Sequence, residues 1–299
     1  MASSIKHLHF TVTALIFFGF GCRSGRTGDG SEAKDALITV SGDVITLERP
    51  WNEVLDSEKD EAMHEALKLV AERVVAANVG NPDGSRTAEE LQNMSISTTI
   101  ADGNRYLYNN IDELADHGLT WTDVVPTGFF FLVGGKFTAN IKLAAGGSAD
   151  AIIIVLPRKV IRTIKGTRQV TEHWRFKVNL AFIATGDPGV GIGGGAATRV
   201  GAGLIWGELN DPSEFRGPVA GVSATTSFGV GIRHRLMVLK RNSSSAFQNI
   251  LYSATYEWGA NAEVGVFGHI GLAVPITSVM QQLGLGAGDL VSRPKVIRQ

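Results

Sequence analysis

Apolar residues follow two different periods along the chain. Between residues 58 and 77 they recur every three or four positions, at Met63, Ala66, Leu67, Val70, Val74 and Ala77. This spacing puts them on one face of a helix. Ser57 and the acidic residues that follow it form a typical helix start. A second, shorter helix is predicted after the capping box formed by Thr87 and Glu90.

From residue 129 the period changes to two, which is the period of a β-strand. Alternating runs occupy 129–275, and Asp187-Pro188-Gly189 between two of them has the composition of a turn. A shorter β-rich pair around Ser41-Gly42-Asp43 predicts a hairpin near the N-terminus. The pattern therefore predicts an α+β, mainly β protein, in which a small helical and hairpin region precedes about six to eight long antiparallel strands in meander order.

Glycine is the most unusual part of the composition. The chain has 36 glycines, and many of those in the strands share one face, such as Gly191 and Gly193 in one run and Gly229 and Gly231 in the next. Glycine in a strand usually marks a bend or a close approach of two backbones. Because a face lined with glycine lets long strands curl tightly, we expect a small closed barrel or a strongly curled sheet.

The first residues have the features of an export signal. A short polar leader precedes the apolar run Phe10–Phe20, which is too short to span a bilayer. Cleavage after Gly21 would place Cys22, the only cysteine, at the start of the mature chain. This arrangement resembles a bacterial lipoprotein signal, and Arg23 in place of an aspartate favours the outer membrane. Secretion with a free Cys22 stays open, because the residues before the cysteine depart from the usual lipoprotein pattern.

These features divide the chain into five segments. A signal peptide (1–21) is followed by a polar, Gly/Ser-rich tether (22–35) that has no apolar period and is expected to be flexible. A mixed α/β region (36–128) with the helix near 58–77 precedes the antiparallel β-domain (129–275). A short helix and tail (276–299) end the chain.

Most motifs that carry chemistry are incomplete. Gly189–Gly194 has the G-x-G-x-x-G spacing of a dinucleotide site, but a strand rather than the required helix is predicted after it. His64 begins a zinc-protease motif without its second histidine, and the segment around Ser223 lacks the second glycine of a hydrolase elbow. A single cysteine excludes a Cys-based metal site, and no basic stretch with interleaved aromatics indicates nucleic-acid binding. We therefore predict a non-catalytic protein with no cofactor, metal or nucleic-acid partner.

Charged residues on the later strands form one candidate site. The cluster consists of Arg199, Arg233, Arg235, Glu257, Asn261, Glu263 and His269, which share faces of successive runs. Cross-strand ion pairs, each worth less than ~1 kcal/mol when exposed, are the interpretation that we favour. A polar lumen or a ligand site is the functional alternative.

Three functions fit this pattern. The first is a lipid-anchored outer-membrane protein that faces the periplasm and binds an apolar ligand such as lipid, or another envelope protein, through its β-domain. The stretches GVGIGGG (189–195) and FGVGI (228–232) resemble the Gly-rich strands of bacterial SYLF-type lipid-binding domains, which implies lipid binding. The second is a membrane-inserted β-barrel, although runs of about 20 residues exceed the roughly 9–11 that a membrane strand needs. The third is an envelope hydrolase that uses Glu257, Glu263 or His269.

Overall fold

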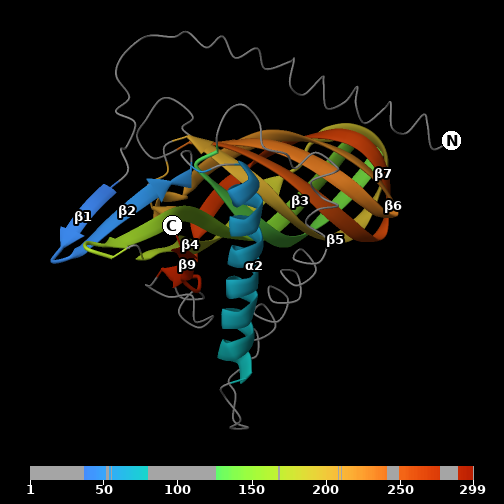
Figure 1. Ribbon diagram of the computed structural model, residues 1–299. Helices are drawn as coiled ribbons and strands as arrows, with labels where there is room; N and C mark the ends of the chain where they lie inside the picture. Colours follow the sequence, from blue (N-terminus) through green and yellow to red (C-terminus); the bar gives the residue numbers. More distant parts are fainter. Residues whose placement is uncertain are drawn as a thin grey trace, which may run out of the picture.

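The computed structural model describes residues 37–51, 54, 56–79, 126–167, 169–207, 209, 211–240, 249–276 and 289–298. Over these residues the protein is mostly antiparallel β-sheet with one long helix (Figure 1). The predicted signal peptide, the tether with Cys22 and the short helix after Thr87 lie outside the described residues. The helix predicted beyond residue 276 falls largely in 277–288, which are not described either.

The N-terminal hairpin is present and joins the main sheet. Strand β1 (Leu37–Ser41) pairs with β2 (Val44–Pro50) across Gly42, whose φ of +57° favours glycine. Strand β2 then pairs with the end of β3 (Gly128–Ile164). The hairpin and the long strands therefore belong to one sheet.

Helix α2 (Asp56–Val79) covers the range in which the sequence predicts a helix. Its apolar face is buried against the sheet, in a core with Trp51, Phe129, Trp174 and Phe176. Ion pairs join its polar side to the strands, from Glu58 to Lys159 and from Glu61 to Lys295. Within the described part of the chain, no helix has both the length and the apolar composition needed to cross a membrane.

The strands do not follow the predicted meander order. The described sheet has nine strands in the order β1-β2-β3-β5-β7-β4-β8, with β6 paired to β7 and β9 to β4. The long strands after β3 are β4 (Gln169–Gly186), β5 (Gly189–Gly207), β6 (Gly217–Leu239) and β7 (Asn249–Pro275). A short 3-10 helix, η2 (Pro212–Glu214), lies between β5 and β6. The tail pairs with β4 as β8 (Leu290–Val291) and β9 (Lys295–Arg298).

The predicted turn at Asp187-Pro188-Gly189 is wrong. Strands β4 and β5 do not pair with each other; they follow one another along β7 in a single register, with Gly186 opposite Ile270 and Gly189 opposite Phe267. Proline has no N–H for the ladder, but the carbonyl of Pro188 accepts a 2.7 Å hydrogen bond from the N–H of Gly268. The ladder therefore continues past the proline, and β4 and β5 act as one bent strand.

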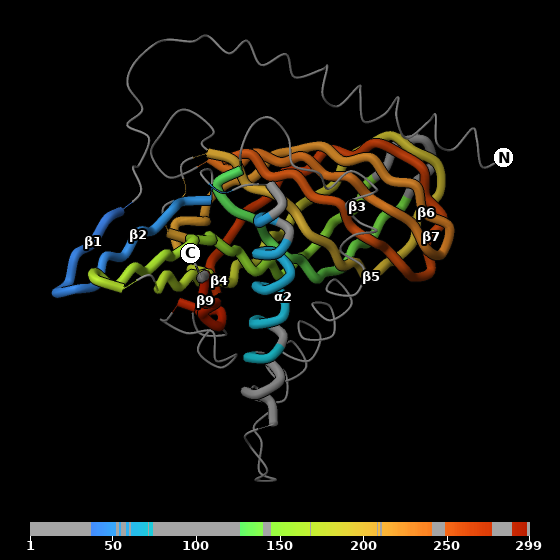
Figure 2. The backbone as a smooth tube through the Cα atoms, viewed as in Figure 1, coloured from blue at the N-terminus to red at the C-terminus, as the bar shows by residue number. Residues whose placement is uncertain are grey.

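The sheet curls back on itself at both outer long strands. In β3, Gly134 lies against Asp150 and Gly146 against Thr138, so the two halves of the strand run antiparallel beside each other. In β6, the same return is closed by a 3.0 Å hydrogen bond from the N–H of Lys240 to the carbonyl of Pro218. Figure 2 shows β5, β6 and β7 turning back together on the side of the sheet away from β1 and β2.

Glycines stand where the strands turn back. Gly193 in β5 has a φ of +95° and Gly229 in β6 a φ of +74°, values that favour glycine over every other residue. We call the region around these two residues the folded end of the sheet. Because the strands bend here without breaking, the predicted six to eight long strands appear as five, β3 to β7.

Apolar residues pack on both faces of the sheet. Alternate residues of β3 point to opposite faces, so Phe129 and Phe131 belong to the core that includes α2, whereas Phe130 and Leu132 belong to a second core. The second core lies on the concave face with Ile152 and fills the part of the interior away from the folded end. Polar side chains occupy the rest of the concave face.

Candidate functional site

The curled sheet brings the predicted charged cluster together in its interior. All seven side chains are at most 5% exposed: Arg199, Arg233, Arg235, Glu257, Asn261, Glu263 and His269. Ion pairs between strands are present, as between Arg233 and Glu257, but they are buried, so the small energy expected of exposed pairs does not apply. The reason for this burial is the curl, which makes strands that are not neighbours in the sheet face each other across the concave side.

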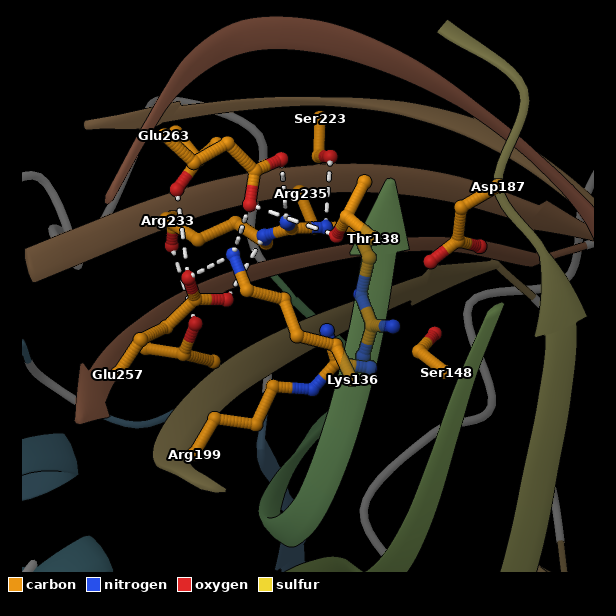
Figure 3. A network of polar contacts seen from close by, with 12 residues as sticks. Lys136, Thr138, Ser148, Asp187, Arg199, Ser223, Arg233, Arg235, Glu257 and Glu263 are labelled. Carbon is orange, nitrogen blue, oxygen red and sulfur yellow. Dashed lines mark hydrogen bonds and ion pairs between the residues drawn. The ribbon is translucent and has the colours of Figure 1, made fainter. Parts of the chain in front are cut away.

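Strand β3 and its neighbours add residues that the sequence did not single out. Lys136 and Asp150 come from β3, and Asp187 follows β4; all three are buried. Hydroxyl groups complete the set, which we call the inner polar cluster: the predicted seven, these three, and Thr138, Ser148, Thr185, Ser223 and Thr225. Figure 3 shows part of this cluster, including Lys136, Arg233 and Glu257. A signal existed in the sequence, because Lys136 and Asp150 are in phase with the apolar residues Phe130 and Ile152 of the same strand.

The charges of the inner polar cluster balance. Four cations (Lys136, Arg199, Arg233, Arg235) accompany four carboxylates (Asp150, Asp187, Glu257, Glu263), so four minus four leaves no net charge when His269 is neutral. Removing an ion from water costs several kcal/mol, and close opposite charges with hydrogen bonds offset that cost. The balance explains how so many charged groups can be buried together.

Asp150 holds two arginines. Its carboxylate accepts hydrogen bonds of 2.7 and 2.6 Å from Nε and Nη2 of Arg199, a bidentate pair, and one of 2.8 Å from Nη2 of Arg235. Ion pairs with these two guanidinium groups favour the ionised form of Asp150. Asp150 is therefore a carboxylate that joins β3 to β5 and β6.

A second group surrounds Lys136. Its Nζ forms an ion pair with Glu257 and another, at 2.8 Å, with Oε2 of Glu263. Nε of Arg233 lies 2.8 Å from Oε1 of Glu257, and its guanidinium carbon is 5.3 Å from the ring centroid of Phe267. This group connects β3, β6 and β7 near the folded end.

A third group is a chain of hydrogen bonds through His269. Nδ1 of His269 is 2.7 Å from Oδ1 of Asp187, and Nε2 is 2.7 Å from Oγ of Ser223. Oγ1 of Thr185 donates a further hydrogen bond of 2.6 Å to Oδ1 of Asp187. With His269 neutral and Asp187 ionised the charges of the inner polar cluster balance, so the buried site favours these two protonation states.

These protonation states fix the proton positions in the chain. An ionised Asp187 can only accept a hydrogen bond, so Nδ1 of His269 carries the ring proton and donates it to Oδ1. Nε2 is then the acceptor, and the hydroxyl of Ser223 donates to it. Nη1 of Arg233 donates to the same hydroxyl oxygen at 3.3 Å.

Comparison of the chain with protein-family models, curated proteins and solved structures found no match. Among the described residues, no group of three or more His, Cys, Asp or Glu side chains is placed to hold a metal ion. The site itself offers paired charges, donated protons and a serine in contact with a neutral imidazole, and these features determine the chemistry that it can perform.

Proposed function

We propose that this protein is a membrane-inserted protein of the bacterial outer membrane, whose curled sheet contacts lipid directly. The proposal includes closure of the sheet into a barrel. A membrane-inserted barrel is the second of the three functions that the sequence left open. The observation that carries it is the inverted polarity of the strands near the folded end, which have apolar residues outside and charged residues inside.

Strand β7 illustrates the inverted polarity. Its outward positions hold apolar side chains that are largely exposed, including Val266 (46%), Ile270 (70%) and Leu272 (50%). The alternate positions hold Glu263 and His269, which are 1% exposed. A soluble sheet has the opposite arrangement, with apolar residues inside and polar residues outside. Alternation of this sense is typical of strands that face lipid on one side and a polar interior on the other.

The exposed apolar residues of neighbouring strands lie together. Val190 is opposite Val266 in the β5–β7 pair, and Phe228 and Val230 flank the bend of β6 on the other side of β7. Further exposed members are Phe137 (62%) and Ile192 (82%). We call this surface the apolar outer face. Soluble proteins rarely expose contiguous apolar patches larger than a few hundred Å², so lipid contact accounts for a surface that water would destabilise.

The rest of the protein limits how lipid can reach the sheet. Helix α2 covers part of the convex side with the core around Trp51 and Phe129, so the apolar outer face beyond the helix is the part that contacts lipid. The balanced charge of the inner polar cluster suits a hydrocarbon environment, where an unpaired charge is costly. A lipid on Cys22, which is proposed on the sequence alone, would tether the chain to the same membrane.

Extraction from membranes tests the proposal. The full chain and its Cys22→Ser variant are expressed in a Gram-negative host, and the membranes are washed with urea or alkaline carbonate. We expect Cys22→Ser to stay in the membrane pellet, because the apolar outer face holds it there. Release of Cys22→Ser into the supernatant would contradict insertion and favour the first function, a periplasmic domain held only by its lipid.

A pair of matched variants locates the contact with lipid. Adding Ile192→Asp to Cys22→Ser places a charge on the apolar outer face and should move most of the protein to the soluble or aggregated fraction. Adding Ile38→Asp instead changes a residue that is also exposed (64%) but lies on β1, away from the folded end. The second variant should behave as Cys22→Ser does; equal effects of the two would overturn the assignment of the lipid-contacting surface.

A further inference from the structure

We infer that the inner polar cluster contains an acyl-transfer site in which Ser223 is the nucleophile, His269 the general base and Asp187 the carboxylate that orients the base. The substrate class is a carboxylic ester. That the ester belongs to a membrane lipid rests on the proposed function; the chemistry of the site does not. The inference goes beyond membrane insertion and departs from the sequence-based prediction of a non-catalytic protein.

The register of the sheet places these three residues side by side. By the register of β7 with β4 and β5, Asp187 falls directly opposite His269, between the pairs Gly186–Ile270 and Gly189–Phe267. On the other side of β7, Ser223 pairs with Phe267, two residues before His269, so it is a diagonal neighbour of His269 on the same face. His269 thus stands between a carboxylate on one neighbouring strand and a hydroxyl on the other.

The contacts match the roles that nucleophilic catalysis requires. The nucleophile must lie within about 2.6–3.2 Å of its base, and a third group must orient the base. Both His269 contacts measure 2.7 Å. Asp187 is itself fixed by a 2.6 Å hydrogen bond from the hydroxyl of Thr185, which is in turn 2.7 Å from the hydroxyl of Ser148. The orienting carboxylate therefore has its own support.

The electrostatics of the site suit the same reaction. A neutral imidazole with its proton on Nδ1 has its free lone pair on Nε2, which points to Ser223. Nη1 of Arg233, 3.3 Å from the Ser223 hydroxyl, puts a positive charge beside the place where an oxyanion develops.

The reaction balances with water as the only co-substrate. Oγ of Ser223 attacks the ester carbonyl carbon as its proton passes to Nε2 of His269. The bond from carbon to the alkoxy oxygen then breaks, and His269 protonates the leaving alcohol. Water attacks the acyl-serine by the same path, with His269 taking and returning the proton, and releases the carboxylic acid. No oxidation or reduction takes place.

Access to the buried serine is assigned to the part of the sheet where glycines occupy the outward positions. Beside Asp187, the residues Gly147, Gly186 and Gly268 contribute no side chains to the outer surface, and Gly186 is exposed. Ser148 and Thr185, at 8% and 7%, are the hydroxyl groups of the inner polar cluster nearest to solvent. Ile270 of the apolar outer face lies opposite Gly186. An acyl chain held on that face is therefore next to the wall behind which Ser223 lies, and a local opening of the wall admits the ester.

Covalent labelling of the full chain in detergent tests the site directly. A fluorophosphonate probe reacts with serines activated by a neighbouring base, and peptide mass spectrometry locates the label. We expect labelling at Ser223 in the unaltered protein and at least a tenfold loss in both Ser223→Ala and His269→Asn. Hydrolysis of p-nitrophenyl butyrate should fall by a similar factor in the same variants.

A matched control separates catalysis from packing. Ser227→Ala removes another buried hydroxyl from an inward position of β6, where Ser227 lies opposite Glu263 and Gly221 lies opposite His269. It should leave labelling of Ser223 unchanged. If Ser223→Ala does not fold, Ser223→Cys in the Cys22→Ser background keeps a nucleophile in place, and the thiol should react with iodoacetamide faster than it does after adding His269→Asn.

Three outcomes would overturn the site. They are no label on Ser223 in the folded protein, labelling that does not depend on His269, and an equal loss in Ser227→Ala. Because the assays use detergent-solubilised protein and a soluble ester, their failure leaves the extraction result on membrane insertion untouched.

Discussion

Asp187 lies across the β-ladder from His269, and the two side chains share a 2.7 Å hydrogen bond in the interior of the sheet. Neither residue is near the other in sequence, and Pro188 separates Asp187 from the strand that continues the same ladder. The contact exists because β4 and β5 keep one register along β7. It couples the stability of the folded end to the protonation of both groups.

The first prediction concerns this coupling and pH. Protonation of His269 would add a positive charge to a buried cluster in which four cations and four carboxylates already balance, and protonation of Asp187 would remove one of those carboxylates. Stability should therefore be highest near neutral pH and should fall as acidification protonates first histidine and then aspartate side chains.

Thermal unfolding in detergent between pH 7 and 4 measures the effect. The melting temperature should fall on acidification, and His269→Gln should flatten the profile, because Asp187, Ser223, Arg233 and Arg235 then face a group that does not titrate. An unchanged profile in His269→Gln would show that other groups cause the acid sensitivity.

The second prediction concerns Asp150. Asp150→Asn removes the carboxylate that forms ion pairs with Arg199 and Arg235, so two buried guanidinium groups lose that partner. We expect a loss of about 3–5 kcal/mol in the free energy of unfolding, measured by urea denaturation. Asp43→Asn, an exposed aspartate in the β1–β2 turn, is the control and should change it by less than ~0.5 kcal/mol. Similar effects of the two would mean that the Asp150 pairs contribute little.

The third prediction concerns the bend of the strands. A Cβ at Gly193 would lie 1.7 Å from the carbonyl oxygen of Ala262, and the φ of +95° is itself unfavourable for alanine. Gly193→Ala should therefore prevent the fold or shift the β5–β7 register, seen as a lost cooperative melting transition. Gly135→Ala is the matched control, because its Cβ would meet only the carbonyl of Ala197 at 3.7 Å. Normal melting of Gly193→Ala would exclude a fixed bend at this residue.

The fourth prediction concerns the attachment of α2. Leu67 is fully buried in the core between the helix and the sheet, so Leu67→Ala should lower the free energy of unfolding by about 2–5 kcal/mol. Lys68→Ala, one residue on and exposed, should have an effect near zero. Equal stability of both variants would show that α2 does not pack on the sheet in solution.

Periodicity in the sequence predicted most of the local structure. The three-to-four-residue spacing around Leu67 located the helix, and the two-residue alternation from Phe129 located the β region. The same two-residue alternation placed the seven charged and polar residues from Arg199 to His269 on shared strand faces. What it could not supply is which strands pair, because the register of β7 with β4 depends on contacts that are distant in sequence.

Asp187 and Ser223 were missed because the strand register was not predicted from the sequence. A proline between an aspartate and a glycine normally marks a turn, so Asp187 had no place in the predicted cluster. Ser223 was set aside because its neighbours lack a known nucleophile motif, yet the structure puts it against His269. A sequence motif describes a serine held by one local turn, whereas the contact between Ser223 and His269 joins two neighbouring strands. Cys22 lies outside the described residues, and its acylation stays a prediction that the mass of the mature N-terminus would test.

The unbroken passage from β4 into β5 restricts how this gene can vary. Side chains alternate faces at every step of a strand, so one codon inserted beside Pro188 would rotate everything that follows: Arg199 would point outward and Val200 into the charged interior. A substitution on either side of the proline changes the contacts of one side chain. A change of length there would exchange the inward and outward faces of the strands that follow.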